Sequence, residues 1–165
     1  MPKKNKKLVR FNTYDDKEKK AVLRVLKSGV LSGFLGNRVS GLKGGPYVNK
    51  FETNIKNFFN VKYAITVNSW STGLTCAVGA IGIEPGDEII LPTWTMTACS
   101  AAVLHWNAIP VFADIDSETF NICIKSIKKN ITKKTKAIMV VDIFGLPSNY
   151  KEIKKIAKKH KLKII

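Results

Sequence analysis

The stretch that decides the fold of this chain is Val67-Asn68-Ser69-Trp70-Ser71-Thr72-Gly73-Leu74. An apolar run leads into it and a run of small and apolar residues leads out, which predicts a buried strand, a tight polar turn and a helix. Free backbone N–H groups and the positive end of the helix dipole make such a helix start a candidate anion site. Ser71 and Thr72 add hydroxyl donors, and Gly73 would allow a ligand to approach closely. An ordinary Ser/Thr N-cap is the alternative that this stretch leaves open.

The composition indicates one globular chain with a large excess of positive charge. Of its 165 residues, 45% are hydrophobic and 24% are charged, which excludes an intrinsically disordered chain. Lys and Arg number 28 against 12 Asp and Glu, so the net charge is +16. Arginine recognises phosphates and guanine edges bidentately, and only Arg10, Arg24 and Arg38 are present. We therefore expect a solvated basic surface and no nucleic-acid partner. A basic interaction module, which would bind nucleic acid in a salt-dependent way, stays open.

Targeting and redox features favour the cytoplasm. No apolar stretch approaches the length that spans a bilayer, and the basic N-terminus is not followed by the apolar segment of a signal peptide. Cys76, Cys99 and Cys123 are scattered and form no CxxC pair, which predicts neither a zinc site nor a disulfide framework. We expect a cytoplasmic protein with no metal and no membrane partner.

Two amphipathic helices are predicted before the regular part of the chain. Apolar residues recur at helical spacing over 15–28 and 47–59. A glycine-rich loop joins them, and a loop of that length is either functional or disordered. We therefore divide the chain into a basic tail, 1–14, the helices and glycine-rich loop, 15–60, and an α/β domain, 61–165.

From residue 61 onward, strand patterns alternate with helix patterns. The predicted strands are 62–67, 88–91, 109–113, 136–143 and 162–165, and the predicted helices are 71–82, 95–106, 123–130 and 148–160. This alternation predicts a mostly parallel, doubly wound sheet whose ligand lies beyond the carboxyl ends of the strands. The last strand ends the sequence without a covering helix, so we expect a truncated domain.

Four blocks of sequence resemble the DegT/DnrJ/StrS family of sugar aminotransferases. They are 68–74, 82–96, 110–116 and 131–138, and Gly44-Gly45-Pro46 ahead of the second helix also fits. The resemblance spans roughly residue 20 to the end and, with the blocks in order, is specific. It implies a pyridoxal-phosphate (PLP) enzyme of fold type I. The chain would then be the N-terminal part of a three-layer α/β large domain like that of aspartate aminotransferase.

The resemblance implies roles for individual positions. Ser71 and Thr72 fall where backbone amides and a hydroxyl hold the PLP phosphate. Met96 falls where an aromatic side chain often stacks on the pyridine ring, and a thioether can also lie against that ring. Trp94 would belong to the wall of the site or to a dimer contact. The glycine-rich loop from Gly33 to Gly45 falls in the region that contributes to the nucleotide-sugar pocket, often across a homodimer interface.

The resemblance also implies a reaction. A complete family member moves an amino group from an amino acid, usually glutamate, to a keto-sugar nucleotide in cell-surface polysaccharide biosynthesis. In the family, an aspartate that keeps the pyridine nitrogen protonated and the lysine that forms the Schiff base come later than Ile165. We therefore expect the 165-residue chain alone to be inactive. A PLP-dependent sugar dehydratase, in which that lysine is replaced, and a non-catalytic remnant stay open as alternatives.

The resemblance makes a further prediction about strand 62–67. In the family's sheet the first strand lies beside the last one, so this strand would lack its usual neighbour here. An exposed, β-rich edge of that kind promotes aggregation.

The remaining acidic and imidazole side chains are weaker candidates for chemistry. Asp114 and Asp116 could form a carboxylate pair, but a loop that places acidic residues after a strand is the more frequent arrangement. His105 and His160 are predicted to be structural or solvated, and their surroundings support no Ser-His-Asp triad.

Overall fold

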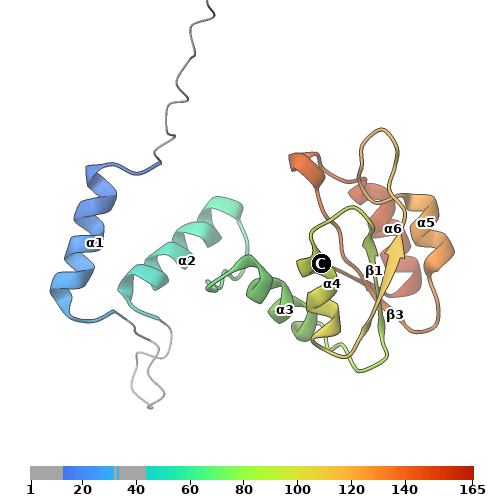
Figure 1. Ribbon diagram of the computed structural model, residues 1–165, viewed down its shortest axis with the longest axis horizontal. Helices are drawn as coiled ribbons and strands as arrows, with labels where there is room; N and C mark the ends of the chain where they lie inside the picture. The colour runs from blue at the N-terminus through green and yellow to red at the C-terminus, as the bar shows by residue number, and fades with distance from the viewer. Residues whose placement is uncertain (1–12, 32, 34–43) are drawn as a thin grey trace, which may run out of the picture. The chain divides into compact units, whose positions relative to one another are not determined.

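The structure is a computed structural model that describes residues 13–31, 33 and 44–165. The chain divides into two compact units, Met1–Thr66 and Val67–Ile165 (Figure 1). Residues 1–12 of the predicted basic tail and residues 34–43 of the glycine-rich loop lie outside the described residues.

The first unit contains two helices, α1 (Asp16–Ser28) and α2 (Pro46–Phe59). A capping box starts α1: the Asp15 carboxylate accepts from the Lys17 N–H, and the Glu18 carboxylate accepts from the Asp15 N–H, each at 2.7 Å. None of the described residues in either helix is buried, so both helices keep an open apolar face. The two amphipathic helices predicted from the sequence are confirmed.

Residues 61–66 follow α2 without forming a strand. The predicted strand 62–67 is therefore wrong, and the unpaired β edge expected from it is absent. A strand needs a neighbour to satisfy its N–H and C=O groups, and none of the described strands pairs with this segment. Ile65 is accordingly 83% exposed. The segment is held instead by α2, because Glu52 Oε1 accepts hydrogen bonds from the N–H and the hydroxyl of Thr66.

The second unit is built on a parallel sheet. Its strands are β1 (Glu88–Pro92), β2 (Ile109–Ala113), β3 (Thr135–Ile138) and β4 (Lys163–Ile164), in the order β2-β1-β3-β4. At the centre, Ile90 pairs with Val111 of β2 and with Ile138 of β3. The predicted strand 136–143 ends early, although the Met139 N–H still donates to the Ile90 carbonyl at 2.8 Å.

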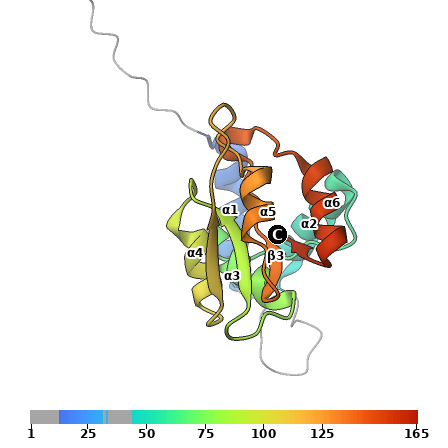
Figure 2. The same ribbon diagram turned by 90° about the vertical axis from the view of Figure 1, so that its right-hand side faces the viewer.

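Helices cover both faces of this sheet (Figures 1 and 2). The helices α3 (Trp70–Ala80) and α4 (Thr97–Leu104) pack on one face, and α5 (Ile124–Asn130) and α6 (Tyr150–His160) pack on the other. Successive residues of β1 point to opposite faces. Ile89 and Leu91 share one core with Val78 of α3, whereas Ile90 shares the other core with Ile153 of α6. The three-layer, mostly parallel α/β fold is confirmed.

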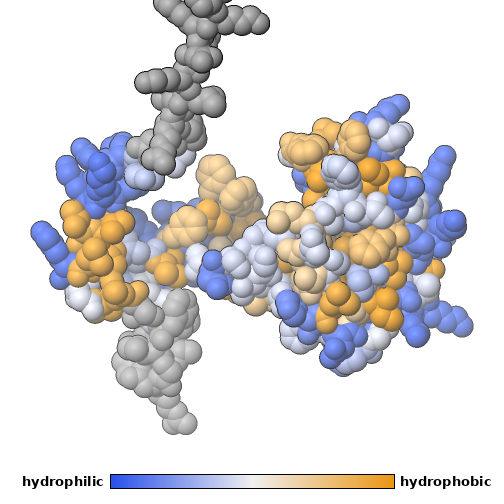
Figure 3. Space-filling model, in the orientation of Figure 1, coloured by the Kyte–Doolittle hydropathy of each residue, from blue (hydrophilic) through white to orange (hydrophobic). Residues whose placement is uncertain are grey.

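The two helical layers differ in charge. Helices α3 and α4 contain no charged residue, whereas α5 and α6 are rich in lysine. In Figure 3, hydrophilic side chains accordingly cover the side of the unit that carries α5 and α6. Their lysines are Lys125, Lys128, Lys129, Lys151, Lys154, Lys155, Lys158 and Lys159. Within the ranges described, no helix combines the length and the hydrophobicity that a bilayer crossing requires.

Candidate functional site

The N-terminal turn of α3 combines a serine cap with free backbone donors. The Ser69 hydroxyl accepts from the Thr72 N–H at 3.1 Å and lies 3.0 Å from the Thr72 hydroxyl, so Ser69 is the N-cap. The Gly73 N–H donates to the Ser69 carbonyl at 3.1 Å. In the described part of the chain, no acceptor meets the N–H groups of Trp70 and Ser71. The cap and an anion site are therefore compatible, because the cap leaves donors free at the helix start.

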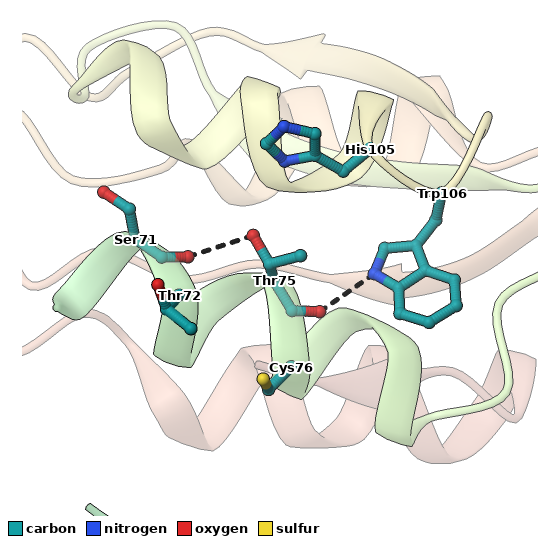
Figure 4. Close-up of a pocket in the computed structure, with 6 residues that line it drawn as sticks. All are labelled: Ser71, Thr72, Thr75, Cys76, His105 and Trp106. Atoms are coloured by element: carbon teal, nitrogen blue, oxygen red, sulfur yellow. Dashed lines mark hydrogen bonds between the residues drawn. The ribbon is translucent and has the colours of Figure 1, made fainter. Parts of the chain in front are cut away.

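The side chains of Ser71 and Thr72 are exposed beside these free donors. The turn carries no acidic residue, so the positive end of the helix dipole is not neutralised locally. In Figure 4 the Ser71 hydroxyl points away from α3, while the Ser71 carbonyl accepts from the Thr75 hydroxyl at 3.0 Å. An anion at this turn would meet backbone N–H groups, hydroxyls and a positive potential together. The structure thus brings Ser71 and Thr72 together in the turn.

The lack of a side chain at Gly73 makes room for Val67 and not for a ligand. A Cβ built on Gly73 would lie 3.1 Å from Cγ2 of Val67. The Val67 side chain therefore occupies the space in front of this glycine. The absence of a side chain lets the segment that enters the turn pack closely against α3.

Met96 immediately precedes α4, in the segment that leaves the carboxyl end of β1. The residue is 72% exposed. Trp94, by contrast, packs against Phe120, with ring centroids 6.3 Å apart and ring planes tilted by 45°. Met96 is therefore free to contact a ligand, whereas Trp94 and Phe120 form a wall at this edge of the sheet.

Helices α3 and α4 run in the same direction along the sheet. Trp106, which follows α4, donates from Nε1 to the Thr75 carbonyl at 2.9 Å (Figure 4). Its ring lies against Gly79. Because the residue that follows α4 contacts the second half of α3, the N-termini of the two helices lie at the same end of the layer. The turn of α3 and Met96 therefore belong to the end at which ligands bind in such sheets.

An open pocket of about 470 Å³ lies along the first half of α3. Its lining residues are Ser71, Thr72, Thr75, Cys76, His105 and Trp106 (Figure 4). The imidazole of His105 is exposed at this pocket, and His160 is exposed at the end of α6. Trp106 was not singled out by the sequence, because a lone tryptophan after a helix forms no recognisable motif.

The two ends of the glycine-rich loop meet in the first unit. A Cβ built on Gly33 would lie 2.5 Å from the backbone of Gly44 and of Gly45, so only glycine fits where the two ends pass each other. Residues 34–43 lie outside the described part of the chain. The role of the loop from Gly33 to Gly45 in substrate binding stays a prediction.

Asn121 joins two loops at the carboxyl edge of the sheet, a role that no local sequence pattern indicates. The residue is 5% exposed. Its Nδ2 donates to the Leu146 carbonyl at 3.0 Å, and its Oδ1 accepts from the Ile143 N–H at 3.1 Å. Phe120 and Phe144 beside these contacts have left-handed φ values of 59° and 51°, which bulky residues rarely adopt. Asn121 therefore stabilises an edge whose backbone is strained.

Asp142 anchors the same edge to the start of α6. Its Oδ1 accepts from the Ser148 N–H at 2.9 Å, and its Oδ2 accepts from the Tyr150 hydroxyl at 3.3 Å. Burial, followed by the negative charge of Asp142 and this hydrogen bond, raises the pKa of Tyr150. The carboxylate thus has a structural task at this edge.

Asp114 and Asp116 build the turn after β2. Asp116 Oδ1 accepts from the N–H and the hydroxyl of Thr119, each at 3.0 Å, and from the Glu118 N–H at 3.2 Å. These hydrogen bonds lower the pKa of Asp116, and the bond from the Thr119 N–H has the largest effect. Asp114 accepts from the Ile115 N–H at 2.8 Å. Among the described residues, no group of three or more His, Cys, Asp and Glu could hold a metal ion.

Several known proteins are similar to this chain. GDP-perosamine synthase of Escherichia coli O157:H7 is 40% identical over 73% of this chain and 33% of its own length. A spore coat polysaccharide biosynthesis protein of Bacillus subtilis is 36% identical over 75% of this chain and 32% of its own. Among solved structures, E. coli GDP-4-keto-6-deoxy-D-mannose-3-dehydratase with bound hydrated PLP is 32% identical, with a TM-score of 0.80 over 93% of this chain and 38% of that one. This chain spans about a third of the length of the curated relatives.

The match to a protein family extends over every described helix and strand of both units. The model of the DegT/DnrJ/EryC1/StrS aminotransferase family matches residues 13–165. The match includes the turn of α3, Met96 and the whole parallel sheet. The chain belongs to the DegT/DnrJ/EryC1/StrS aminotransferase family.

Proposed function

We propose that this chain supplies the phosphate-binding part of the PLP site in a sugar aminotransferase. The complete enzyme would transfer an amino group from an amino acid to a keto-sugar nucleotide in cell-surface polysaccharide biosynthesis. The observation that carries the proposal is the N-terminal turn of α3 in a chain of this family. That turn combines free backbone N–H groups, two exposed hydroxyls and no acidic residue. These are the donors that a phosphate dianion requires.

The chemistry of the residues at this end of the α3–α4 layer fits PLP. Ser71 and Thr72 would hold the phosphate together with the free N–H groups of the turn, and the thioether of Met96 would lie against the ring. When bound, PLP supplies an electron sink for the carbon that loses or gains the amino group. The turn would fix the phosphate and thereby limit the orientations open to the ring. Such prior orientation lowers the entropic part of the reaction barrier.

The proposed substrate class follows from the relatives. The synthase and the dehydratase described above are both named for GDP-linked sugars, and the Bacillus protein is named for polysaccharide biosynthesis. A nucleotide sugar as acceptor and an amino acid as donor are consistent with these names. A PLP-dependent sugar dehydratase is the second candidate, because the solved dehydratase matches 93% of this chain with a TM-score of 0.80.

We further infer that the complete protein is a cytoplasmic homodimer. The layer formed by α3 and α4 has no charged residue in a chain whose net charge is +16. Helices that are apolar on several faces are typical of surfaces covered by other protein, and a second copy would cover this one. Cys76, Cys99 and Cys123 are free thiols, which suits a reducing compartment.

Binding of pyridoxamine 5′-phosphate (PMP) tests the phosphate site. It is measured on the complete protein without substitutions, which is called the natural protein below. The variant Ser71→Asp would place a negative charge beside the phosphate. Like charges about 4 Å apart repel by about 1–4 kcal/mol in a partly solvated site, so we expect an affinity loss of about fivefold or more. Asn57→Asp adds the same charge to the exposed surface of α2 and serves as the control. Equal affinity of Ser71→Asp and the natural protein for PMP would refute the proposal.

Product analysis separates the two candidate reactions. The natural protein is incubated with PLP, glutamate and a keto-sugar nucleotide, and the sugar product is identified by mass spectrometry. A product that carries a new amino group supports the aminotransferase. A product that has lost a hydroxyl group without gaining nitrogen supports the dehydratase.

A further inference from the structure

Trp106 contacts α3 at two points that lie one helical turn apart. Its Nε1–H donates to the Thr75 carbonyl at 2.9 Å. Four residues further on, a Cβ built on Gly79 would overlap the six-membered part of the indole ring. Residues four apart lie on the same face of a helix. The indole therefore rests directly on the α3 backbone, at a position where only glycine leaves room for it.

Thr75 connects this contact to the N-terminal turn. Its hydroxyl donates to the Ser71 carbonyl at 3.0 Å, while its own carbonyl accepts from Trp106. Trp106, Thr75 and Ser71 thus form a continuous hydrogen-bonded series from the end of α4 to the start of α3 (Figure 4). All three residues line the same pocket. A displacement of Trp106 is therefore expected to reach the turn through α3.

Helix α3 packs against α4 and the sheet core mainly through small side chains. Val78 is its one buried residue, and most of its side chains are small. Small side chains make few interlocking contacts, so they resist rotation and sliding of a helix only weakly. Gly73 and Gly79 also lower the intrinsic stability of the helix. The indole of Trp106 adds to this packing a large contact that also carries a directional hydrogen bond.

We propose that Trp106 is a positioning residue for the phosphate of the bound cofactor. The inference rests on the function proposed above. The indole fixes the rotation and the axial position of α3, so that the N–H groups and hydroxyls of its first turn converge on one point. Such convergence matters because binding groups must be held within about 0.5 Å of their productive geometry. Trp106 acts through α3 and not by binding the phosphate itself.

The first test compares PMP with pyridoxamine, which lacks the phosphate, in the natural protein and in two variants of Trp106. Trp106→Phe keeps an aromatic ring over Gly79 and removes the N–H donor, whereas Trp106→Leu removes both. Loss of one hydrogen bond corresponds to about a fivefold loss of affinity. We expect that loss for PMP in Trp106→Phe and a larger one in Trp106→Leu. Pyridoxamine affinity should stay the same in both variants, because the phosphate alone depends on the turn.

A second test changes Gly79, the residue of α3 that the indole contacts. Gly79→Ala places a methyl group where the indole lies, so it should weaken PMP binding in the natural background. In the Trp106→Leu background the indole is gone, and the same change should have much less effect. This non-additivity is the mark of direct coupling between two positions.

A stability control distinguishes positioning from general damage. Ile156→Val removes a methyl group from the core on the other face of the sheet, away from α3. It should lower the unfolding temperature while PMP affinity, measured where all variants are folded, stays unchanged. The proposal is overturned if both Trp106 variants bind PMP like the natural protein, or if they lose pyridoxamine affinity to the same degree. A natural protein that does not prefer PMP to pyridoxamine would instead refute the phosphate site, and with it both proposals.

Discussion

Glu52 and Thr66 are joined by two hydrogen bonds that end on the same carboxylate oxygen, one from the Thr66 N–H at 2.8 Å and one from its hydroxyl at 2.9 Å. Both bonds favour the ionised carboxylate. The N–H contributes most, and together they lower the pKa of Glu52 from its ordinary value of 4.5. The pair therefore contributes stability that is present above the unfolded pKa and is lost as the pH falls through the lower, folded pKa.

We predict that the amide resonance of Thr66 titrates with Glu52, at a pH below 4.5. The physical reason is that protonation of the carboxylate weakens the bond from the Thr66 N–H. A pH series of NMR spectra measures this directly. The titration should disappear in Glu52→Gln and persist in Glu18→Gln, which alters only the cap of α1. A Thr66 amide that titrates equally in both variants would contradict the assignment.

Asn121→Ala should destabilise the second unit. It removes both bonds of a buried amide and leaves the Ile143 N–H and the Leu146 carbonyl without their partner. The expected loss of unfolding free energy is about 1–3 kcal/mol, measured by denaturant titration. Asn121→Asp keeps the acceptor for Ile143 and faces the Leu146 carbonyl with a negative charge, so its stability should recover as the pH falls and the carboxylate is protonated. A pH-independent loss in Asn121→Asp would show that the bond to Leu146 contributes little.

Substitutions of Ser69 should separate the cap from the anion site. Ser69→Ala removes the acceptor for the Thr72 N–H and should cost about 1 kcal/mol of stability. Ser69→Asp keeps an acceptor and adds a charge that favours a helix N-terminus, so the stability should be retained. The same charge repels a phosphate, so PMP should bind Ser69→Asp more weakly than Ser69→Ala. Thermal unfolding measures the stability of both variants, and titration with PMP measures their affinity. Stability and affinity that change in parallel would argue against the proposed anion site.

Tyr150 should ionise at higher pH than an ordinary tyrosine. Burial and the negative charge of Asp142 disfavour the phenolate, so the folded pKa lies above 10.0. The resulting stability is present below the unfolded pKa and is lost as the pH rises through the folded one. The ultraviolet absorbance of phenolate, followed as the pH rises, measures the midpoint. The component of this titration that disappears in Tyr150→Phe belongs to Tyr150. Asp142→Asn should move this component toward lower pH; an unchanged midpoint would leave burial as the only cause.

Leu104→Lys should weaken the proposed dimer. Leu104 is an exposed residue of α4, in the layer that has no charge, and a buried ammonium group there would be costly to desolvate. Sedimentation equilibrium of the natural protein and of the variant measures the change in the dimer dissociation constant. Lys129→Glu changes a charge on α5, on the opposite face of the sheet, and should leave the dimer intact. Equal effects of the two substitutions would place the interface elsewhere.

The parts of the fold that could be predicted are those that depend on neighbours in sequence. The strands 88–91 and 109–113 are short apolar runs bounded by turn residues, and the structure forms both. The cap and the hydroxyls of the α3 turn lie within four residues of one another, so their proximity follows from helix geometry. The location of Ser71 and Thr72 in that turn needed no tertiary information.

Features that depend on distant partners could not be predicted. The apolar run 62–67 has the composition of a strand, but strand formation also requires a neighbour to pair with, and none of the described strands provides it. The bonds of Asn121 reach Ile143 and Leu146, which lie 22 and 25 residues away. The contact between Trp106 and Gly79 likewise depends on how α3 and α4 pack, which no local pattern records.

The contact between Trp106 and α3 has a consequence for the order in which the chain acquires its structure. An isolated helix as short as α3, with two glycines, is unstable in water. Trp106 lies 31 residues beyond Thr75, so its contact forms only after β1 and α4 have been synthesised. During translation, residues 69–72 therefore leave the ribosome well before the tertiary contact from Trp106 can form. If Trp106 positions this turn as proposed, the turn would reach its final geometry only after Trp106 has emerged, and PLP could not bind to a finished site before then.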